Sequence, residues 1–157
     1  MNHRDLCIKA SKYLRSQGIV RFNKCTYSVC ELERLGECPD AFGWNSGTTQ
    51  LIEAKASRSD FLSDKKKHWR INPTHGLGGW RSYICPTGVI KESELPEKWG
   101  LLYVDDKGKV EVIKEPDKQE SNHQAEINLI SSILRRNDIK PQMFSYKNYK
   151  KKDSIRK

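Results

Sequence analysis

Three residues of this sequence, Asp40, Glu53 and Lys55, have the types and the spacing that suit catalysis. Glu53 and Lys55 belong to segment 48–55, whose Leu, Ile and Thr content is typical of a buried strand. Because side chains alternate along a strand, these two point to the same face. Asp40 follows a turn-prone segment that ends at Pro39, and it can supply a second carboxylate to the same place.

Two convergent carboxylates beside one lysine suit a hard divalent cation, which prefers oxygen ligands and keeps several waters. Such an ion polarises a phosphoryl oxygen and makes bound water a nucleophile at neutral pH, while a lysine can orient that water. A carboxylate and an ammonium at the end of a core strand are unfavourable unless they act together. The three residues therefore indicate metal-assisted chemistry on a phosphate ester.

The order of these residues resembles a known group of enzymes. Pro39-Asp40 followed by Glu53-Ala54-Lys55 resembles the PD-(D/E)XK nuclease superfamily, which has the restriction-endonuclease-like fold. The continuation Ser57-Arg58-Ser59-Asp60-Phe61 resembles its MmcB-like branch of proposed DNA-repair nucleases, in which a Ser-Arg-x-Asp-Phe helix start follows the acid–lysine strand. The resemblance covers residues 25–104 and includes the later strand Trp99-Gly100-Leu101-Leu102.

The resemblance implies a role for each motif residue. Asp40 and Glu53 would bind Mg²⁺, the backbone carbonyl of Ala54 would add a ligand, and Mn²⁺ would substitute for Mg²⁺. Lys55 would position or activate the attacking water, or stabilise charge in the transition state. The expected reaction is endonucleolytic hydrolysis of DNA.

An acid from an earlier element often completes the metal site in this superfamily. Glu33 precedes Asp40 by seven residues, and the matching glutamate of the MmcB-like branch lies near that position. We therefore favour Glu33 over Glu31 as a further catalytic and metal-binding residue. The alternative is that both are solvent-facing charges of an expected strand at 25–33.

Four basic side chains are expected to contact phosphates, where they give affinity without sequence information: Arg58, Lys65, Lys66 and Arg70. For Lys66 and Arg70, an ordinary role in solubility is an equal alternative. The resemblance implies DNA as the substrate, whereas the chemistry alone also permits RNA. Two cuts on a duplex often need two active sites, so a homodimer is compatible with this interpretation.

Composition restricts the class of protein further. The 157 residues carry a net charge of +9 with a pI of about 9.3, which favours polyanionic partners, nucleic acid first. No run approaches the roughly 18 apolar residues of a membrane span, and the first residues lack the apolar core of a signal peptide. We therefore expect a cytoplasmic protein without membrane partners.

The five cysteines form no Cys-x-x-Cys pair, and their odd number argues against a disulfide framework. Reduced, mostly buried cysteines are the favoured interpretation. A zinc site made by Cys25, Cys30 and Cys38 with a histidine is the alternative, although the spacings do not match the usual zinc motifs.

Periodicity predicts an α/β domain over residues 1–140, followed by a basic tail at 141–157. Its core would be a mixed sheet of four to five strands, flanked by helices at 2–17, 57–71 and 122–136. Strand patterns occur at 25–33, 41–44, 48–55, 80–85, 101–104 and 110–113.

Two other functions stay open from the sequence. One is a catalytically silent nucleic-acid-binding protein on the same fold, and the other is a small phage-type interaction or inhibitor protein, in which Glu53 and Lys55 form a plain salt bridge. The presence of Asp40, Glu53 and Lys55 together favours a working enzyme.

Overall fold

The structure is a computed structural model of the 157-residue chain, and it describes residues 1–32 and 36–137. The chain divides into two compact units, Met1–Glu126 and Ile127–Lys157. The first unit carries the sheet and all described candidate residues. Glu33 and the expected tail at 141–157 lie outside the described residues.

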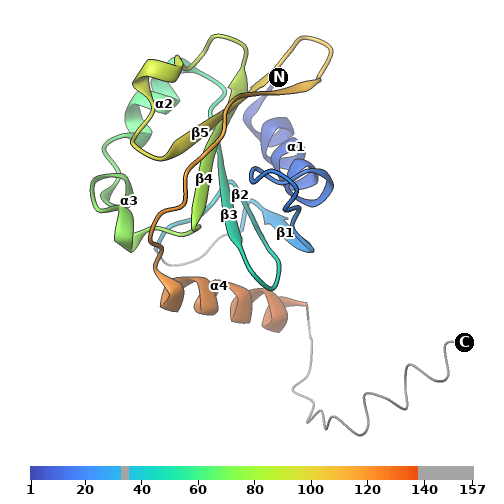
Figure 1. The fold of residues 1–157 in the computed structure, drawn as a ribbon, viewed down its shortest axis with the longest axis vertical. Helices are drawn as coiled ribbons and strands as arrows, with labels where there is room; N and C mark the ends of the chain where they lie inside the picture. The colour runs from blue at the N-terminus through green and yellow to red at the C-terminus, as the bar shows by residue number, and fades with distance from the viewer. Residues whose placement is uncertain (33–35, 138–157) are drawn as a thin grey trace, which may run out of the picture. The chain divides into compact units, whose positions relative to one another are not determined.

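A mixed sheet runs through the first unit (Figure 1). Its six strands lie in chain order: β1 (Tyr27–Cys30), β2 (Ala41–Trp44), β3 (Thr49–Ala54), β4 (Trp80–Pro86), β5 (Trp99–Val104) and β6 (Val110–Lys114). The β3–β4 and β4–β5 pairs are parallel, whereas the β1–β2, β2–β3 and β5–β6 pairs are antiparallel.

The expected α/β class and mixed sheet are confirmed, but the expected number of four to five strands is wrong. Both outer strands extend the sheet to six. β1 pairs with β2 along its whole length, and β6 returns after the turn at Asp105–Gly108 to pair with β5.

Helices cover both faces of this sheet (Figure 1). They are α1 (His3–Ser16), α2 (Arg58–Asp64) and α3 (His68–Ile71), with 3₁₀ turns at Pro73–His75 and Glu92–Glu94. α1 packs on β1, β2 and β3, and α2 and α3 lie on the opposite face. A further helix, α4 (His123–Arg136), begins in the first unit and continues in the second.

The alternation of side chains along β3 sorts apolar from charged residues. Ile52 and Ala54 face α1, where they join a core that includes Leu6, Ala10 and other buried residues of the helix. Glu53 points to the other face, towards α2 and α3. The sheet therefore separates an apolar layer from the layer that holds the charged candidates.

Local capping signals start the two helices nearest to the candidate residues. The side chain of Asn2 accepts a hydrogen bond from the backbone N–H of Asp5 at 2.8 Å and caps α1. The side chain of Ser57 accepts one from the N–H of Asp60 at 3.3 Å and caps α2. None of the described helices combines the length and the apolar character that a membrane crossing needs.

The single helix expected at 57–71 is instead divided between α2 and α3. After Asp64 the chain makes a tight turn. In it, the backbone N–H of Lys66 donates to the carbonyl of Ser63, and that of Lys67 donates to the carbonyl of Asp64. This turn brings Asp64, Lys67 and Arg70 together against the same part of the sheet. The break therefore brings three charged residues of the expected helix into one cluster.

Candidate active site

Lys55 lies at the centre of a charged cluster at the carboxyl end of β3. Its Nζ lies 3.0 Å from Glu53 Oε2, 3.1 Å from Asp64 Oδ1 and 3.7 Å from Asp40 Oδ2. Lys55, Glu53 and Asp64 are buried, whereas the side chain of Asp40 keeps 18% of its surface exposed. The structure thus brings together the three residues that the sequence singled out, and it adds Asp64 to them.

Asp40 is oriented by the backbone of the neighbouring strand. Its Oδ2 accepts a hydrogen bond from the N–H of Ala54 at 2.9 Å, and its Oδ1 lies 3.3 Å from His3 Nε2. Burial and the nearby Glu53 carboxylate raise the pKa of Asp40 to about 6, although Lys55 and His3 oppose this rise. A carboxyl that ionises reluctantly in this place is a reasonable ligand for a cation, which would favour its charged form.

Asp64 is one residue of this site that the sequence did not identify, and Glu37 is another. Asp64 accepts hydrogen bonds from the Tyr83 hydroxyl and from Arg70 Nε, each at 2.8 Å, and Lys67 Nζ lies 2.8 Å from it. Burial alone would raise the pKa of Asp64, but Arg70 and Lys55 lower it well below its usual value. The available signal was its position three residues after the buried Phe61, which places both on the inner face of α2.

Arg70 closes the cluster from α3. It donates to Glu37 at 2.7 Å and to Asp64 at 2.8 Å, and its Nη2 lies 3.3 Å from Glu53 Oε1. Its guanidinium also lies 4.7 Å from the ring centroid of Trp99. Burial alone would lower the pKa of Arg70, but the Glu53 and Asp64 carboxylates raise it above its usual value. Arg70 is therefore a buried, charged residue that connects α3 to the carboxylates of the cluster.

This position corrects one of the expected phosphate contacts. Because Arg70 is buried and paired, it cannot serve as the surface contact that the sequence suggested. Arg58 is exposed but donates to the carboxylate of Glu94, with 2.7 Å between Nη1 and Oε2. Lys65 and Lys66 are exposed, as a phosphate contact requires.

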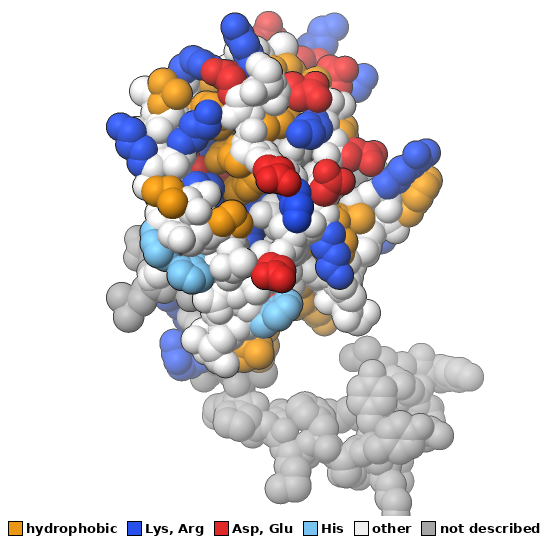
Figure 2. Space-filling view, turned by 60° about the vertical axis from the view of Figure 1, so that its left-hand side comes forward, with side chains coloured by type: hydrophobic (Ala, Val, Ile, Leu, Met, Phe, Trp, Pro, Cys, Tyr) orange, Lys and Arg blue, Asp and Glu red, His pale blue; other side chains and the backbone are white. Residues whose placement is uncertain are grey.

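Figure 2 shows the face that carries α2 and α3. On this face, Lys and Arg side chains are interspersed with Asp and Glu and do not form one continuous basic patch. Attraction of a polyanion to this face would therefore depend on particular lysines more than on a uniform field.

The fourth expected acid is not placed at the site. Glu33, the favoured residue, lies outside the described residues. Glu31, the alternative, is exposed, and its Oε2 lies 3.9 Å from Arg4 Nε. Its backbone N–H donates to the carbonyl of Asp40 at 3.1 Å, so this residue helps to fix the Asp40 backbone.

The charged cluster contains oxygen donors of the type that a hard divalent cation takes. Oε1 of Glu53 is buried and accepts no hydrogen bond, although Arg70 lies nearby, and Oδ1 of Asp40 faces outward towards His3. Carboxylate and carbonyl oxygens, here including that of Ala54, are the ligands that Mg²⁺ and Mn²⁺ prefer. The cluster has an excess of carboxylates over cations: Glu37, Asp40, Glu53 and Asp64 against Lys55, Lys67 and Arg70.

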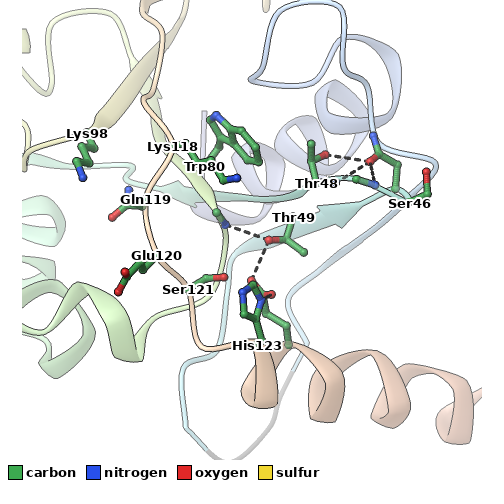
Figure 3. A pocket seen from close by; sticks show the side chains of 14 residues that line it. Ser46, Thr48, Thr49, Trp80, Lys98, Lys118, Gln119, Glu120, Ser121 and His123 are labelled. Atoms are coloured by element: carbon green, nitrogen blue, oxygen red, sulfur yellow. Dashed lines mark hydrogen bonds and ion pairs between the residues drawn. The ribbon is translucent and has the colours of Figure 1, made fainter.

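A separate hollow of about 820 Å³ lies at the other end of β3 (Figure 3). Most of the residues that line it are polar, and one of them, Thr49, accepts a hydrogen bond from the N–H of Gly79 at 3.0 Å and donates one to Glu126 at 2.9 Å through Oγ1. Along a strand, four residues span roughly 13 Å, so the hollow is well separated from Glu53. None of the expected site residues lines it.

Comparison with known proteins informs the fold only. No family model matches the sequence, and no curated protein matches it with significance. Among solved structures, a protein of unknown function from Silicibacter pomeroyi is similar, with a TM-score of 0.57 and 20% sequence identity. The match covers 92% of this chain and 99% of that chain.

Proposed function

We propose that this protein is a metal-dependent endonuclease that hydrolyses DNA phosphodiester bonds at Asp40, Glu53 and Lys55. The observation that carries the proposal is the position of one lysine ammonium within 3.7 Å of both carboxylates, at the end of a central strand. Asp40 and Glu53 are 13 positions apart in the sequence. If the chain has the restriction-endonuclease-like fold that the resemblance to the PD-(D/E)XK superfamily implies, these two residues and Lys55 must lie close together. Their convergence supports the proposal.

Asp40, Glu53 and the carbonyl of Ala54 are the groups that would hold Mg²⁺. When bound, the ion supplies polarisation of a phosphoryl oxygen and lowers the pKa of a coordinated water. The protein contributes the geometry of the ligands, because the N–H of Ala54 holds Asp40 Oδ2 and leaves Oδ1 available.

The surroundings of Lys55 determine what this residue can do. Burial alone would lower the pKa of Lys55, but Glu53, Asp64 and Asp40 raise it above its usual value. The side chain therefore stays an ammonium at neutral pH, where it can donate hydrogen bonds but cannot accept a proton. We assign to it the orientation of the attacking water and the stabilisation of negative charge on the phosphate, and not general base catalysis.

The substrate is assigned from the resemblance, and two of the expected phosphate contacts are exposed. Lys65 and Lys66 follow α2 directly, one and two residues after Asp64, and both are exposed. They can therefore meet the phosphates that flank a scissile bond near Asp64. The same chemistry would act on RNA, so both polymers belong in the test.

The test is a cleavage assay with labelled duplex, nicked and single-stranded DNA and RNA, in Mg²⁺, Mn²⁺ or EDTA. We expect cleavage of DNA with either metal and none in EDTA. Asp40→Asn and Glu53→Gln should each reduce the rate at least about 100-fold, because a lone carboxylate binds Mg²⁺ weakly. Glu111→Gln, which changes an exposed acid on β6 in the same way, is the control and should retain full activity.

One observation favours a second candidate, a nucleic-acid-binding protein without catalysis. Glu53 is only 1% exposed, and its oxygens lie 3.0 Å from Lys55, 3.3 Å from Arg70 and 3.9 Å from Lys67. A metal ion must compete with these cations for the carboxylate. Salt-sensitive binding to DNA without cleavage in any metal would establish this candidate and overturn the first.

A further inference from the structure

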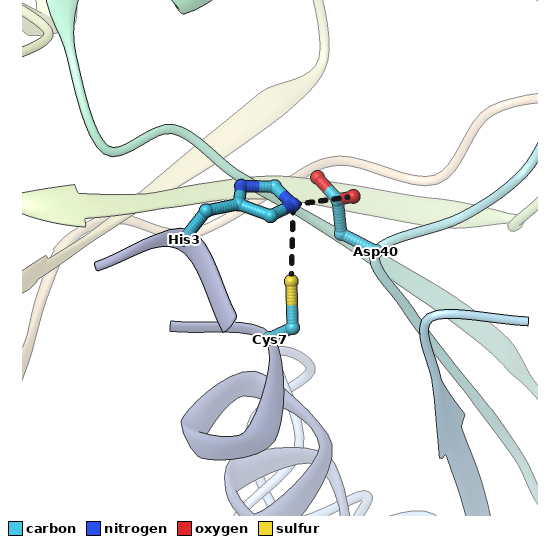
Figure 4. Close-up of side chains that lie close together, drawn as sticks. All are labelled: His3, Cys7 and Asp40. Carbon is cyan, nitrogen blue, oxygen red and sulfur yellow. Dashed lines mark hydrogen bonds and ion pairs between the residues drawn. The ribbon is translucent and has the colours of Figure 1, made fainter. Parts of the chain in front are cut away.

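A second group of ligand atoms lies on the α1 side of Asp40 (Figure 4). His3 and Cys7 come from the first two turns of α1, and Asp40 directly precedes β2. His3 Nε2 lies 3.4 Å from Cys7 Sγ and 3.3 Å from Asp40 Oδ1. All three ligand atoms lie within 4.8 Å of one another.

Two of these distances match the edges of a tetrahedral metal site. Zinc binds nitrogen and oxygen at about 2.0–2.2 Å and sulfur at about 2.3 Å. In a tetrahedron with these bond lengths, neighbouring ligand atoms lie roughly 3.3–3.6 Å apart. The His3–Cys7 and His3–Asp40 separations of 3.4 Å and 3.3 Å fall in this range.

One hydrogen on His3 Nε2 cannot serve both Cys7 and Asp40. A neutral imidazole nitrogen carries either one proton or one lone pair, so Nε2 of His3 cannot make a full hydrogen bond to both neighbours. If Nε2 carries a proton, it donates a hydrogen bond to Asp40. If Nε2 carries a lone pair, it accepts a hydrogen bond from the Cys7 thiol, but this lone pair then faces those of the Asp40 carboxylate. One cation between the three atoms satisfies all of them.

The group is also held in place before any ion arrives. His3 and Cys7 are four residues apart on a helix, so they share a face, and Asn2 caps that helix. Asp40 is held by the N–H of Ala54 through Oδ2, which leaves Oδ1 towards His3. Cys7 is fully buried, while the His3 side chain is 49% exposed and provides a path for entry.

We propose that His3, Cys7 and Asp40 bind one late first-row divalent cation of the zinc class. The nitrogen, sulfur and oxygen donors select such an ion over Mg²⁺, which prefers oxygen alone. Binding replaces the thiol proton of Cys7 by the metal and releases that proton to solvent. Water completes the fourth position, since three ligands from the protein leave it open.

The site has a consequence for catalysis that rests on the proposed function. Asp40 belongs both to this group and to the oxygen donors proposed for Mg²⁺. A zinc-class ion that takes Asp40 Oδ1 would withdraw this carboxylate from the Mg²⁺ site. We therefore expect Zn²⁺ to inhibit Mg²⁺-dependent cleavage, and His3→Ala to relieve that inhibition.

The test uses Co²⁺ as a spectroscopic probe, added to the reduced full-length protein. We expect one tightly bound equivalent with a thiolate-to-cobalt charge-transfer band, displaced by Zn²⁺. Cys7→Ser should abolish the band, and His3→Ala should weaken binding at least about tenfold, as expected for loss of a ligand. Cys38→Ser, which removes an exposed thiol, should retain the wild-type spectrum.

A competing site must be separated in the same experiment. His68 Nε2 and His75 Nδ1 lie 2.7 Å apart on the exposed side of α3 and the following turn, and two histidines also attract these metals. His68→Ala should leave the charge-transfer band unchanged. If His68→Ala removes the bound ion, or if Cys7→Ser and His3→Ala bind Co²⁺ like the wild type, the proposal is overturned.

The two proposals fail separately. Wild-type protein that binds Co²⁺ through Cys7 but cuts no nucleic acid would retain the metal site and refute the nuclease. Protein that cuts in Mg²⁺, with no thiolate-to-cobalt band, would retain the nuclease and refute the metal site.

Discussion

Asp64 Oδ1 lies 3.1 Å from Lys55 Nζ, and this contact joins α2 to the end of β3. Asp64 is also the acceptor for Tyr83 and Arg70, so a single buried carboxylate links the helix to β4 and α3. The candidate catalytic lysine is therefore held by a residue outside the motif that the sequence displays. We therefore expect Asp64 to contribute both to the stability of the protein and to the proposed cleavage activity.

Asp64→Asn keeps the size of the side chain but removes its charge. Because it leaves buried Lys55 and Arg70 with fewer anions, we expect it to reduce the free energy of unfolding by about 3 kcal/mol. Urea denaturation of the two proteins at pH 7 measures this difference. Asp60→Asn, an exposed acid in the same helix, should change the free energy by less than about 0.5 kcal/mol. Equal effects of the two substitutions would contradict the account of the cluster.

The contribution of Asp64 should also depend on pH. Its pKa in the folded protein is lowered, whereas the unfolded chain has a carboxyl pKa of about 3.9. The stabilisation is therefore fully present above about pH 4 and is lost as the pH falls towards the folded pKa. Denaturation curves from pH 7 to pH 3 should show the gap between wild type and Asp64→Asn narrowing at acid pH. A difference in unfolding free energy that grows at acid pH would contradict the lowered pKa of Asp64.

Substitutions of Arg70 and Lys66 distinguish the role of a buried positive charge from that of an exposed one. Arg70→Met removes the partner of Glu37, Asp64 and Glu53, so we expect a loss of at least about 3 kcal/mol in unfolding free energy.

Lys66→Ala should change stability by less than about 0.5 kcal/mol. It should instead weaken DNA binding and reduce the salt dependence by about one unit of slope. Thermal melts and DNA titrations at several salt concentrations check both expectations.

Arg81 is a second buried arginine, and its role is structural. It donates hydrogen bonds to the carbonyls of Gly78, Pro73, Gly76 and Glu120, which fixes the segment before β4. Arg81→Met would leave these carbonyls without their donor, at a cost of about 3 kcal/mol or more. We expect a lower melting temperature and faster proteolysis within 72–79. Unchanged proteolysis would contradict this role.

Local signals predicted much of the fold. The strand at Ala41–Trp44 was expected with the observed bounds, and the caps Asn2 and Ser57 are the first residues of the helices expected at 2–17 and 57–71. These features depend on neighbours in sequence: an alternating apolar pattern, or a capping side chain three residues before its donor. The convergence of Asp40 with Glu53 and Lys55 was also expected, because the motif order implied it.

The remaining features depend on residues that are distant in sequence. Arg70 was expected at the surface as a phosphate contact or a charge for solubility, yet Glu37, 33 residues earlier, pairs with it inside the protein. The first helix ends at Asp64, whose carboxylate contacts Tyr83 and Lys55 on the sheet. No local pattern records such partners, so charge alone could not separate buried from exposed residues.

The central claim is that Lys55 acts in phosphodiester cleavage, and its most direct test compares cleavage with binding. Wild-type protein and Lys55→Met would be assayed on the same labelled DNA in Mg²⁺, with thermal melts to show that both are folded. Lys55→Gln, which keeps a hydrogen-bond donor beside Glu53 and Asp64 but removes the charge, serves as a second variant if Lys55→Met unfolds.

The account predicts that the wild type cuts, and that a folded Lys55 variant binds the same DNA with similar affinity but cuts at least about 100-fold more slowly. A folded Lys55 variant that cuts at the wild-type rate would contradict it, and so would a wild type that does not cut.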